Sequence, residues 1–154
     1  MSQQKCDVLV VEDDPDVSLF LERAFEKAGL VGPICRVPDG EQAISYFKGE
    51  GIYADRDRYP VPALILLSLR LPKKSGLEVL AWFRQQPGIG GIPVVILTGA
   101  ASPDDINDAY AAGANSVLIT PFGFEPLVEI VRAIRQYWLI INQGPFPPKH
   151  ERTS

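Results

Sequence analysis

Short apolar runs alternate with amphipathic stretches along the chain, and this alternation restricts the fold more than any other feature. The runs are rich in valine, isoleucine and leucine, which is typical of strands buried on both faces of a sheet. Five such runs predict strands at residues 8–11, 31–37, 63–67, 93–97 and 116–119. Strands and helices in this strict alternation predict an α/β fold, with a five-stranded, doubly wound parallel sheet and helices on both faces.

Cap residues predict where two of the helices begin. Asp14 precedes Pro15, which is the pattern of an N-cap followed by proline at the first helical position. Ser75 and Glu78 have the spacing of a capping box. The last predicted helix carries apolar residues at helical spacing as far as Ile141.

The composition excludes several classes of protein. The chain has 154 residues, 46% of them hydrophobic and 22% charged, which predicts one ordinary globular domain. A net charge of −4 argues against a nucleic-acid or anionic-membrane partner. No apolar run approaches the roughly 18 residues of a membrane span, and no secretory signal precedes Val8, so we expect a cytoplasmic protein. The only histidine, His150, lies near the end of the sequence and argues against Ser-His-Asp hydrolases and histidine zinc sites.

Polar residues follow the predicted strands at the edge of the sheet where function is expected. In doubly wound sheets, the functional crevice lies beyond the carboxyl ends of the strands. The polar residues at those ends are Glu12, Asp13, Asp14, Ser68, Thr98 and Thr120.

The strand ends resemble the landmarks of the receiver domain of two-component response regulators. The segments that carry the resemblance are VLVVEDD at 8–14, LILLSLRLP at 64–72, LTG at 97–99 and TPF at 120–122. The resemblance covers residues 6–141, is followed by a proline-rich tail at 142–154, and implies the flavodoxin-like receiver fold. Three further segments are similar to single-domain regulators that partner phytochrome-type histidine kinases, namely residues 53–55, 71–76 and 137–139.

The resemblance implies roles for individual residues. Glu12 and Asp13 match the acidic pair that binds Mg²⁺ in receivers, where the backbone carbonyl of Arg70 would be a further ligand. Thr98 matches the hydroxyl that contacts the phosphate. The position of the phosphoryl-accepting aspartate holds Ser68 instead.

Two more positions depart from the receiver pattern. Thr120 stands where receivers have a phosphate-binding lysine, and Val117 stands where they have a switch aromatic. An acyl phosphate forms on a carboxylate that is ionised near neutral pH, whereas an unactivated serine such as Ser68 is protonated there. Thr120 supplies no cation for a phosphate, and Arg70 is the nearest candidate to neutralise the acidic residues.

These departures predict a phosphorylation-deficient pseudo-receiver rather than an enzyme. Such a protein acts in two-component signalling by protein–protein interaction, with a histidine kinase or another signalling protein as its partner. One alternative is an active receiver that uses Asp13 or Asp14 as a non-standard acceptor. A second is a flavodoxin-like cofactor binder, but an acidic loop after the first strand repels the phosphate that such a protein must bind.

The end of the last helix is apolar on several faces. Four consecutive positions there hold Tyr137, Trp138, Leu139 and Ile140. Together these side chains present more apolar surface than is needed to cover the sheet. Either the proline-rich tail covers these side chains or they form an interface. We expect a homodimer through this surface.

Overall fold

The computed structural model describes residues 7–29 and 34–141, which form one parallel sheet with helices on both faces. The strand order is β2-β1-β3-β4-β5. The strands are β1 (Val8–Val11), β2 (Ile34–Val37), β3 (Leu64–Ser68), β4 (Val94–Thr98) and β5 (Ser116–Ile119). The predicted five-stranded, doubly wound sheet is confirmed. Residues 31–33 of the predicted second strand lie outside the described residues.

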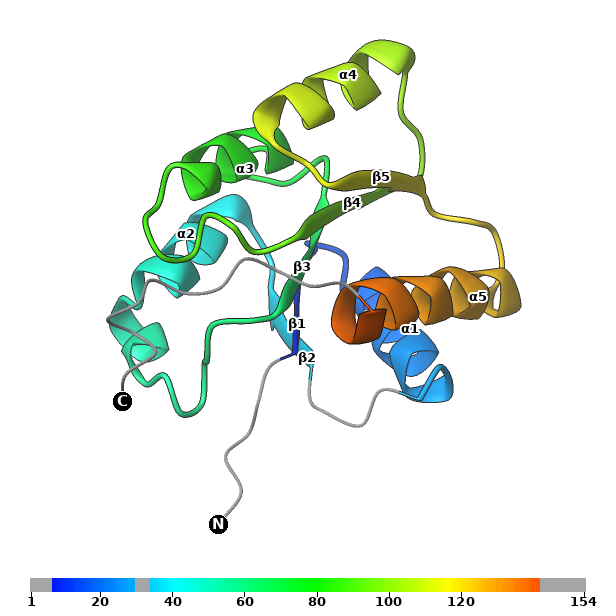
Figure 1. Cartoon of the computed structure of the whole chain (residues 1–154), viewed down its shortest axis with the longest axis horizontal. Coiled ribbons are helices and arrows are strands. Elements are labelled where there is room, and N and C mark those ends of the chain that lie inside the picture. Colours follow the sequence, from blue (N-terminus) through cyan, green and yellow to red (C-terminus); the bar gives the residue numbers. More distant parts are fainter. Residues whose placement is uncertain (1–6, 30–33, 142–154) are drawn as a thin grey trace.

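The α-helices of the described chain cover the sheet in two layers (Figure 1). One layer consists of α1 (Pro15–Lys27) and α5 (Phe124–Ile134), which lie side by side. The other consists of α2 (Gly40–Lys48), α3 (Gly76–Arg84) and α4 (Pro103–Ala112). No helix among the described residues is both long and apolar enough to cross a membrane.

Alternate residues of the central strands enter two separate apolar cores. On β1, Leu9 and Val11 pack in the core formed with α2 and α3, whereas Val8 and Val10 pack in the core formed with α1 and α5. All four side chains are at most 2% exposed. Burial on both faces explains why the strands read as nearly continuous apolar runs, since each buried face contributes hydrophobic stabilisation.

Side-chain caps stabilise the first turns of the helices that follow β1, β3 and β4. The carboxylate of Asp14 accepts a hydrogen bond from the backbone N–H of Asp16 at 2.9 Å, as the cap pattern predicts. Ser75 and Glu78 form the predicted capping box at the start of α3. Ser102 forms a second capping box at the start of α4. These caps satisfy N–H groups that would otherwise lack partners in the first turns.

The end of the last helix differs from the predicted regular helix. The α-helix ends at Ile134 and is followed by a π-helical segment, η2 (Arg135–Ile141). The apolar spacing used for the prediction is compatible with both helix types, because it does not record which carbonyl each N–H contacts. A short 3₁₀ helix, η1 (Gly51–Ala54), lies between α2 and β3.

Candidate functional site

The carboxyl ends of β1, β3 and β4 line one cavity of about 590 Å³ together with the residue that follows β5. Its polar lining includes Glu12, Asp13, Ser68, Thr98 and Thr120. The strand register explains the grouping, because Val11 pairs with Leu67 and Ser68 pairs with Leu97, so the chain leaves these strands at similar heights. The structure therefore brings together residues that are far apart in the sequence.

The acidic side of the cavity is formed by the loop between β1 and α1. Glu12 is half-buried, and its carboxylate accepts a hydrogen bond from the backbone N–H of Asp14 at 2.9 Å. Burial is the main cause of a raised pKa for Glu12, partly offset by this hydrogen bond. Asp13 is exposed at the rim, whereas Asp14 uses its carboxylate to cap α1.

Arg36, a cation that was not predicted from the sequence, contacts the acidic loop. Its Nε donates to the hydroxyl of Ser18 at 2.7 Å, and its Nη2 donates to the carbonyls of Glu12 at 3.3 Å and Asp13 at 3.4 Å. Arg36 lies on β2 and pairs in register with Val10 of β1. A charged residue on an edge strand beside the first strand is the sequence signal that would have pointed to it.

Ser68, the last residue of β3, is turned towards its own loop. Its hydroxyl donates a hydrogen bond to the backbone carbonyl of Arg70 at 3.3 Å. That carbonyl is the group that the receiver resemblance implies as a metal ligand.

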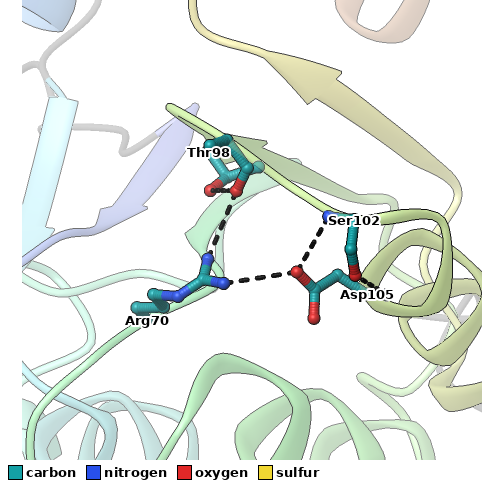
Figure 2. A network of polar contacts seen from close by, with 5 residues as sticks. Arg70, Thr98, Ser102 and Asp105 are labelled. Carbon is teal, nitrogen blue, oxygen red and sulfur yellow. Dashed lines mark hydrogen bonds and ion pairs between the residues drawn. The ribbon is translucent and has the colours of Figure 1, made fainter.

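The prediction that Arg70 neutralises the acidic residues is wrong. Its Nη2 lies 3.2 Å from the carboxylate of Asp105 on α4, and its Nη1 donates to the carbonyl of Ala100 at 3.3 Å (Figure 2). The physical reason is that the capping box of α4 and the loop before it place a carboxylate and a backbone carbonyl within reach of the Arg70 guanidinium.

Thr98 is almost completely buried at the end of β4. Its hydroxyl donates to the carbonyl of Ala100 at 3.1 Å, the same oxygen that accepts from Arg70 (Figure 2). The backbone N–H of Thr120 donates to the carbonyl of Thr98 at 2.7 Å, which brings Thr120 to the cavity. Hydroxyls thus occupy the ends of β3 and β4 and the position after β5.

Val117 lies half-buried on β5, and an aromatic residue from α4 reaches it. The backbone N–H of Val117 donates to the phenol oxygen of Tyr110 at 3.3 Å. Because β5 is an edge strand, this contact gives a partner to an N–H that points away from the sheet. Tyr110 was not predicted to lie here, and its position seven residues before Val117 gives no signal that the two residues meet.

The sequence family described as the response regulator receiver domain matches residues 8–132. The chain belongs to this family. It is a receiver of two-component signal transduction. The probable methanogenesis regulatory protein FilR2 of Methanothrix harundinacea is 39% identical over 140 residues, which cover 91% of this chain and 88% of FilR2. The response regulator Rcp1 of Synechocystis is 33% identical over 132 residues, covering 86% of this chain and 88% of Rcp1.

Solved structures of receivers have the same fold. The phosphorylated cyanobacterial phytochrome response regulator RcpA superposes with a TM-score of 0.82 at 33% identity, covering 92% of this chain and 99% of RcpA. RPA3017, a response regulator in red light signalling of R. palustris, gives a TM-score of 0.84 at 32% identity, covering 90% of this chain and 97% of that one. The resemblance to receivers, and to phytochrome response regulators among them, is confirmed.

The receiver site offers a poor donor set for a divalent cation. The residues that the structure describes contain no group of three or more histidine, cysteine, aspartate or glutamate side chains that could hold a metal ion. Glu12 and Asp13 remain as carboxylates, and the Glu12 carboxylate already accepts the N–H of Asp14. Since Mg²⁺ needs several oxygen ligands with carboxylates among them, these residues fit it poorly.

The apolar residues at the end of this receiver lie in two environments. Trp138 and Leu139 are partly buried against the core formed by α1 and α5. Tyr137 and Ile140 are 51% and 52% exposed. The tail that the sequence analysis proposed as a cover, residues 142–154, lies outside the described residues.

Proposed function

We propose that this receiver is a phosphorylation-deficient pseudo-receiver that works in two-component signalling by protein–protein interaction. The observation that carries the proposal is the end of β3, where the position of the phosphoryl acceptor holds a hydroxyl. Ser68 directs this hydroxyl to the Arg70 carbonyl rather than to a base that would activate it. We therefore expect signal transfer through binding rather than through a covalent phosphoryl group.

The electrostatics of the cavity support this proposal. A phosphoryl group brings negative charge to a site that already contains Glu12 and Asp13. Thr120 provides no positive charge to balance it, and the guanidinium of Arg70 is paired with Asp105. Both the missing nucleophile and the unbalanced charge therefore oppose phosphorylation at this site.

The partner class follows from the relatives. Receivers interact with histidine kinases and other signalling proteins, and this receiver is similar to phytochrome response regulators. We propose a histidine kinase or another cytoplasmic signalling protein as the partner. We further propose a homodimer through Tyr137, Trp138, Leu139 and Ile140, because half of the surface of Tyr137 and of Ile140 is exposed.

Intact-mass measurement after incubation with acetyl phosphate and Mg²⁺ tests the proposal. Wild-type protein is expected to gain no phosphoryl mass, whereas the double variant Ser68→Asp/Thr120→Lys is expected to gain one acid-labile phosphoryl group. The double variant restores the carboxylate and the cation together. Ser68→Asn/Thr120→Lys is the matched control, since it has the same side-chain size without the nucleophile. Stoichiometric labelling of the wild type would overturn the proposal.

An active receiver with a non-standard acceptor is the second candidate. The observation that favours it is Asp13, whose carboxylate is exposed and lines the same cavity. Asp14 is a weaker acceptor because its carboxylate caps α1. If the wild type is labelled, labelling that disappears in Asp13→Asn and persists in Asp14→Asn would identify this alternative.

A further inference from the structure

We propose that Arg70 forms a strap that holds the β4–α4 loop and the first turn of α4 at the rim of the cavity, and that breaking this contact releases both. The Arg70 strap consists of Arg70 and the two acceptors of its guanidinium, the Ala100 carbonyl and the Asp105 carboxylate (Figure 2). It is a charge-dependent conformational device. It does not depend on whether the receiver accepts a phosphoryl group.

One end of the Arg70 strap is anchored in a closed loop. The backbone N–H of Gly76 donates to the carbonyl of Leu69 at 3.1 Å, directly beside Arg70. A Cβ atom at Gly76 would lie 2.2 Å from the carbonyl oxygen of Ser68, so this loop is packed against the end of β3. Leu69 itself is buried. The guanidinium therefore extends from a backbone that has little freedom to follow a moving partner.

The other end of the Arg70 strap consists of two acceptors, and each of them also accepts a hydrogen bond from a second donor. The Ala100 carbonyl also accepts from the Thr98 hydroxyl at 3.1 Å. Oδ2 of Asp105 also accepts from the backbone N–H of Ser102 at 3.0 Å, which is one half of the capping box of α4. Arg70 consequently connects the hydroxyl that lines the cavity with the beginning of α4 (Figure 2).

Gly99, which directly precedes Ala100 in the β4–α4 loop, leaves room for this loop to move when the strap is broken. Gly99 is exposed, and a Cβ atom built on it would meet no atom within 4 Å. The far half of α4 has a separate contact, because the Tyr110 phenol oxygen accepts from the Val117 N–H of β5. We therefore expect release to be confined to the loop and to the first turn of the helix.

The expected size of this release follows from the exposure of the Arg70 side chain. The side chain of Arg70 is 68% exposed, so solvent and salt screen its pairing with Asp105. Exposed pairs of this kind change a local equilibrium by about two- to five-fold. Lysine cannot reproduce a planar fork that reaches two acceptors, so Arg70→Lys should retain only part of the effect.

Amide hydrogen exchange measured by NMR on the full chain tests the inference. In Arg70→Ala, the hydrogen-bonded amides of Ser102, Asp105 and Ile106 are expected to exchange about two- to five-fold faster than in wild type at low salt. Asp105→Asn should act similarly, because it removes the charge and keeps an oxygen for the capping bond. Amides in the last turn of α4 should not change.

Salt and a matched ion pair provide the controls. In 0.5 M NaCl, wild type should approach the exchange rates of Arg70→Ala, and the variant should itself change little. Lys27→Ala removes another exposed pair, Lys27 with Glu125 at 2.7 Å, and should leave the three amides unchanged. Unchanged exchange in both Arg70→Ala and Asp105→Asn would overturn the inference, as would equal acceleration in Lys27→Ala.

Discussion

The hydroxyl of Ser68 donates a hydrogen bond to the backbone carbonyl of Arg70 at 3.3 Å. A carboxylate at position 68 could not make this contact, because an ionised carboxylate accepts hydrogen bonds and donates none. Serine in place of a carboxylate at position 68 therefore changes both the nucleophile and the hydrogen bonding of the loop after β3.

Ser68→Asp is expected to destabilise the receiver in the absence of metal and to make its stability depend on Mg²⁺. The new carboxylate would share the cavity with Glu12 and Asp13, and like charges in one site oppose folding. Mg²⁺ that binds only the folded state adds RT ln(1 + [L]/Kd) to the free energy of unfolding. Urea unfolding with and without Mg²⁺ measures both effects. Ser68→Asn is the uncharged control, and an equal Mg²⁺ response in Ser68→Asn would contradict the prediction.

Tyr137→Ala is expected to shift the proposed dimer towards monomer. Its side chain is half exposed, so the substitution removes apolar contact area between copies with little effect on the core. Sedimentation velocity across a micromolar concentration series measures the change. Ile52→Ala is the control, because Ile52 is 65% exposed and lies in η1, away from the last helix. A wild type that remains monomeric at high concentration would exclude the dimer.

Gly76→Ala is expected to lower the free energy of unfolding by about 1–3 kcal/mol, the usual range for overpacking. A Cβ atom there would lie 2.2 Å from the Ser68 carbonyl oxygen and 3.0 Å from that of Leu69, so backbone atoms must move. Gly99→Ala is the control, since its Cβ would meet no atom within 4 Å, and we expect a change within about 0.5 kcal/mol. Equal unfolding midpoints in urea for the two variants would show that the loop backbone accommodates the added methyl group without loss of stability.

The carboxyl group of Asp105 is expected to titrate below its ordinary pKa. The hydrogen bond from the backbone N–H of Ser102 is the main cause of the lowered pKa, and Arg70 adds to it. Because the pKa is lower in the folded state, the stabilising contribution is present above the unfolded value of 3.8 and disappears as the pH falls through the folded value.

NMR titration of the Asp105 carboxyl carbon measures this pKa directly. Removing Arg70 in Arg70→Ala should raise the pKa, but by less than loss of the backbone hydrogen bond would. The control is Lys27→Ala, which removes the separate Lys27–Glu125 pair and should leave the pKa of Asp105 unchanged. An Asp105 pKa at or above 3.8 in wild type would contradict the capping geometry.

Arg84→Ala is expected to destabilise the receiver by about 3 kcal/mol, in the range for lost hydrogen bonds to a charged group. The Arg84 guanidinium donates to the carbonyls of Gly113, Gly90 and Ile92 and to the side-chain oxygen of Asn115, at 2.6–2.8 Å. Urea unfolding measures the loss, and Arg23→Ala on the exposed surface of α1 is the matched control. Equal stability of the two variants would show that water replaces these contacts without penalty.

The fold was predictable because buried strands leave a strong pattern. Val8–Val11 and Leu64–Ser68 are apolar on both faces, and this requires a covered parallel sheet. The grouping of Glu12, Ser68 and Thr98 followed from the same reasoning, since the carboxyl ends of parallel strands meet at one edge.

The partners of long side chains were not predictable in this way. Arg70 was expected at the acidic loop and instead contacts Asp105, because its direction depends on which acceptors the neighbouring loops present. Arg36 and Tyr110 were missed for a related reason, since each reaches a backbone group on a neighbouring element. The π-helical end at Arg135–Ile141 depends on hydrogen bonding that apolar spacing does not encode.

The strand order also determines when the sheet can assemble during synthesis. Val8 pairs with Ile34 on one side and with Leu64 on the other. The first strand emerging from a ribosome therefore has one neighbour early, but its second neighbour only after α2 and the following loop have been translated. Closing that longer loop carries an additional chain-entropy penalty, which slows formation of the central pair. A nascent chain that stops before residue 64 would expose one edge of β1, an unpaired and strongly apolar strand that is prone to aggregation.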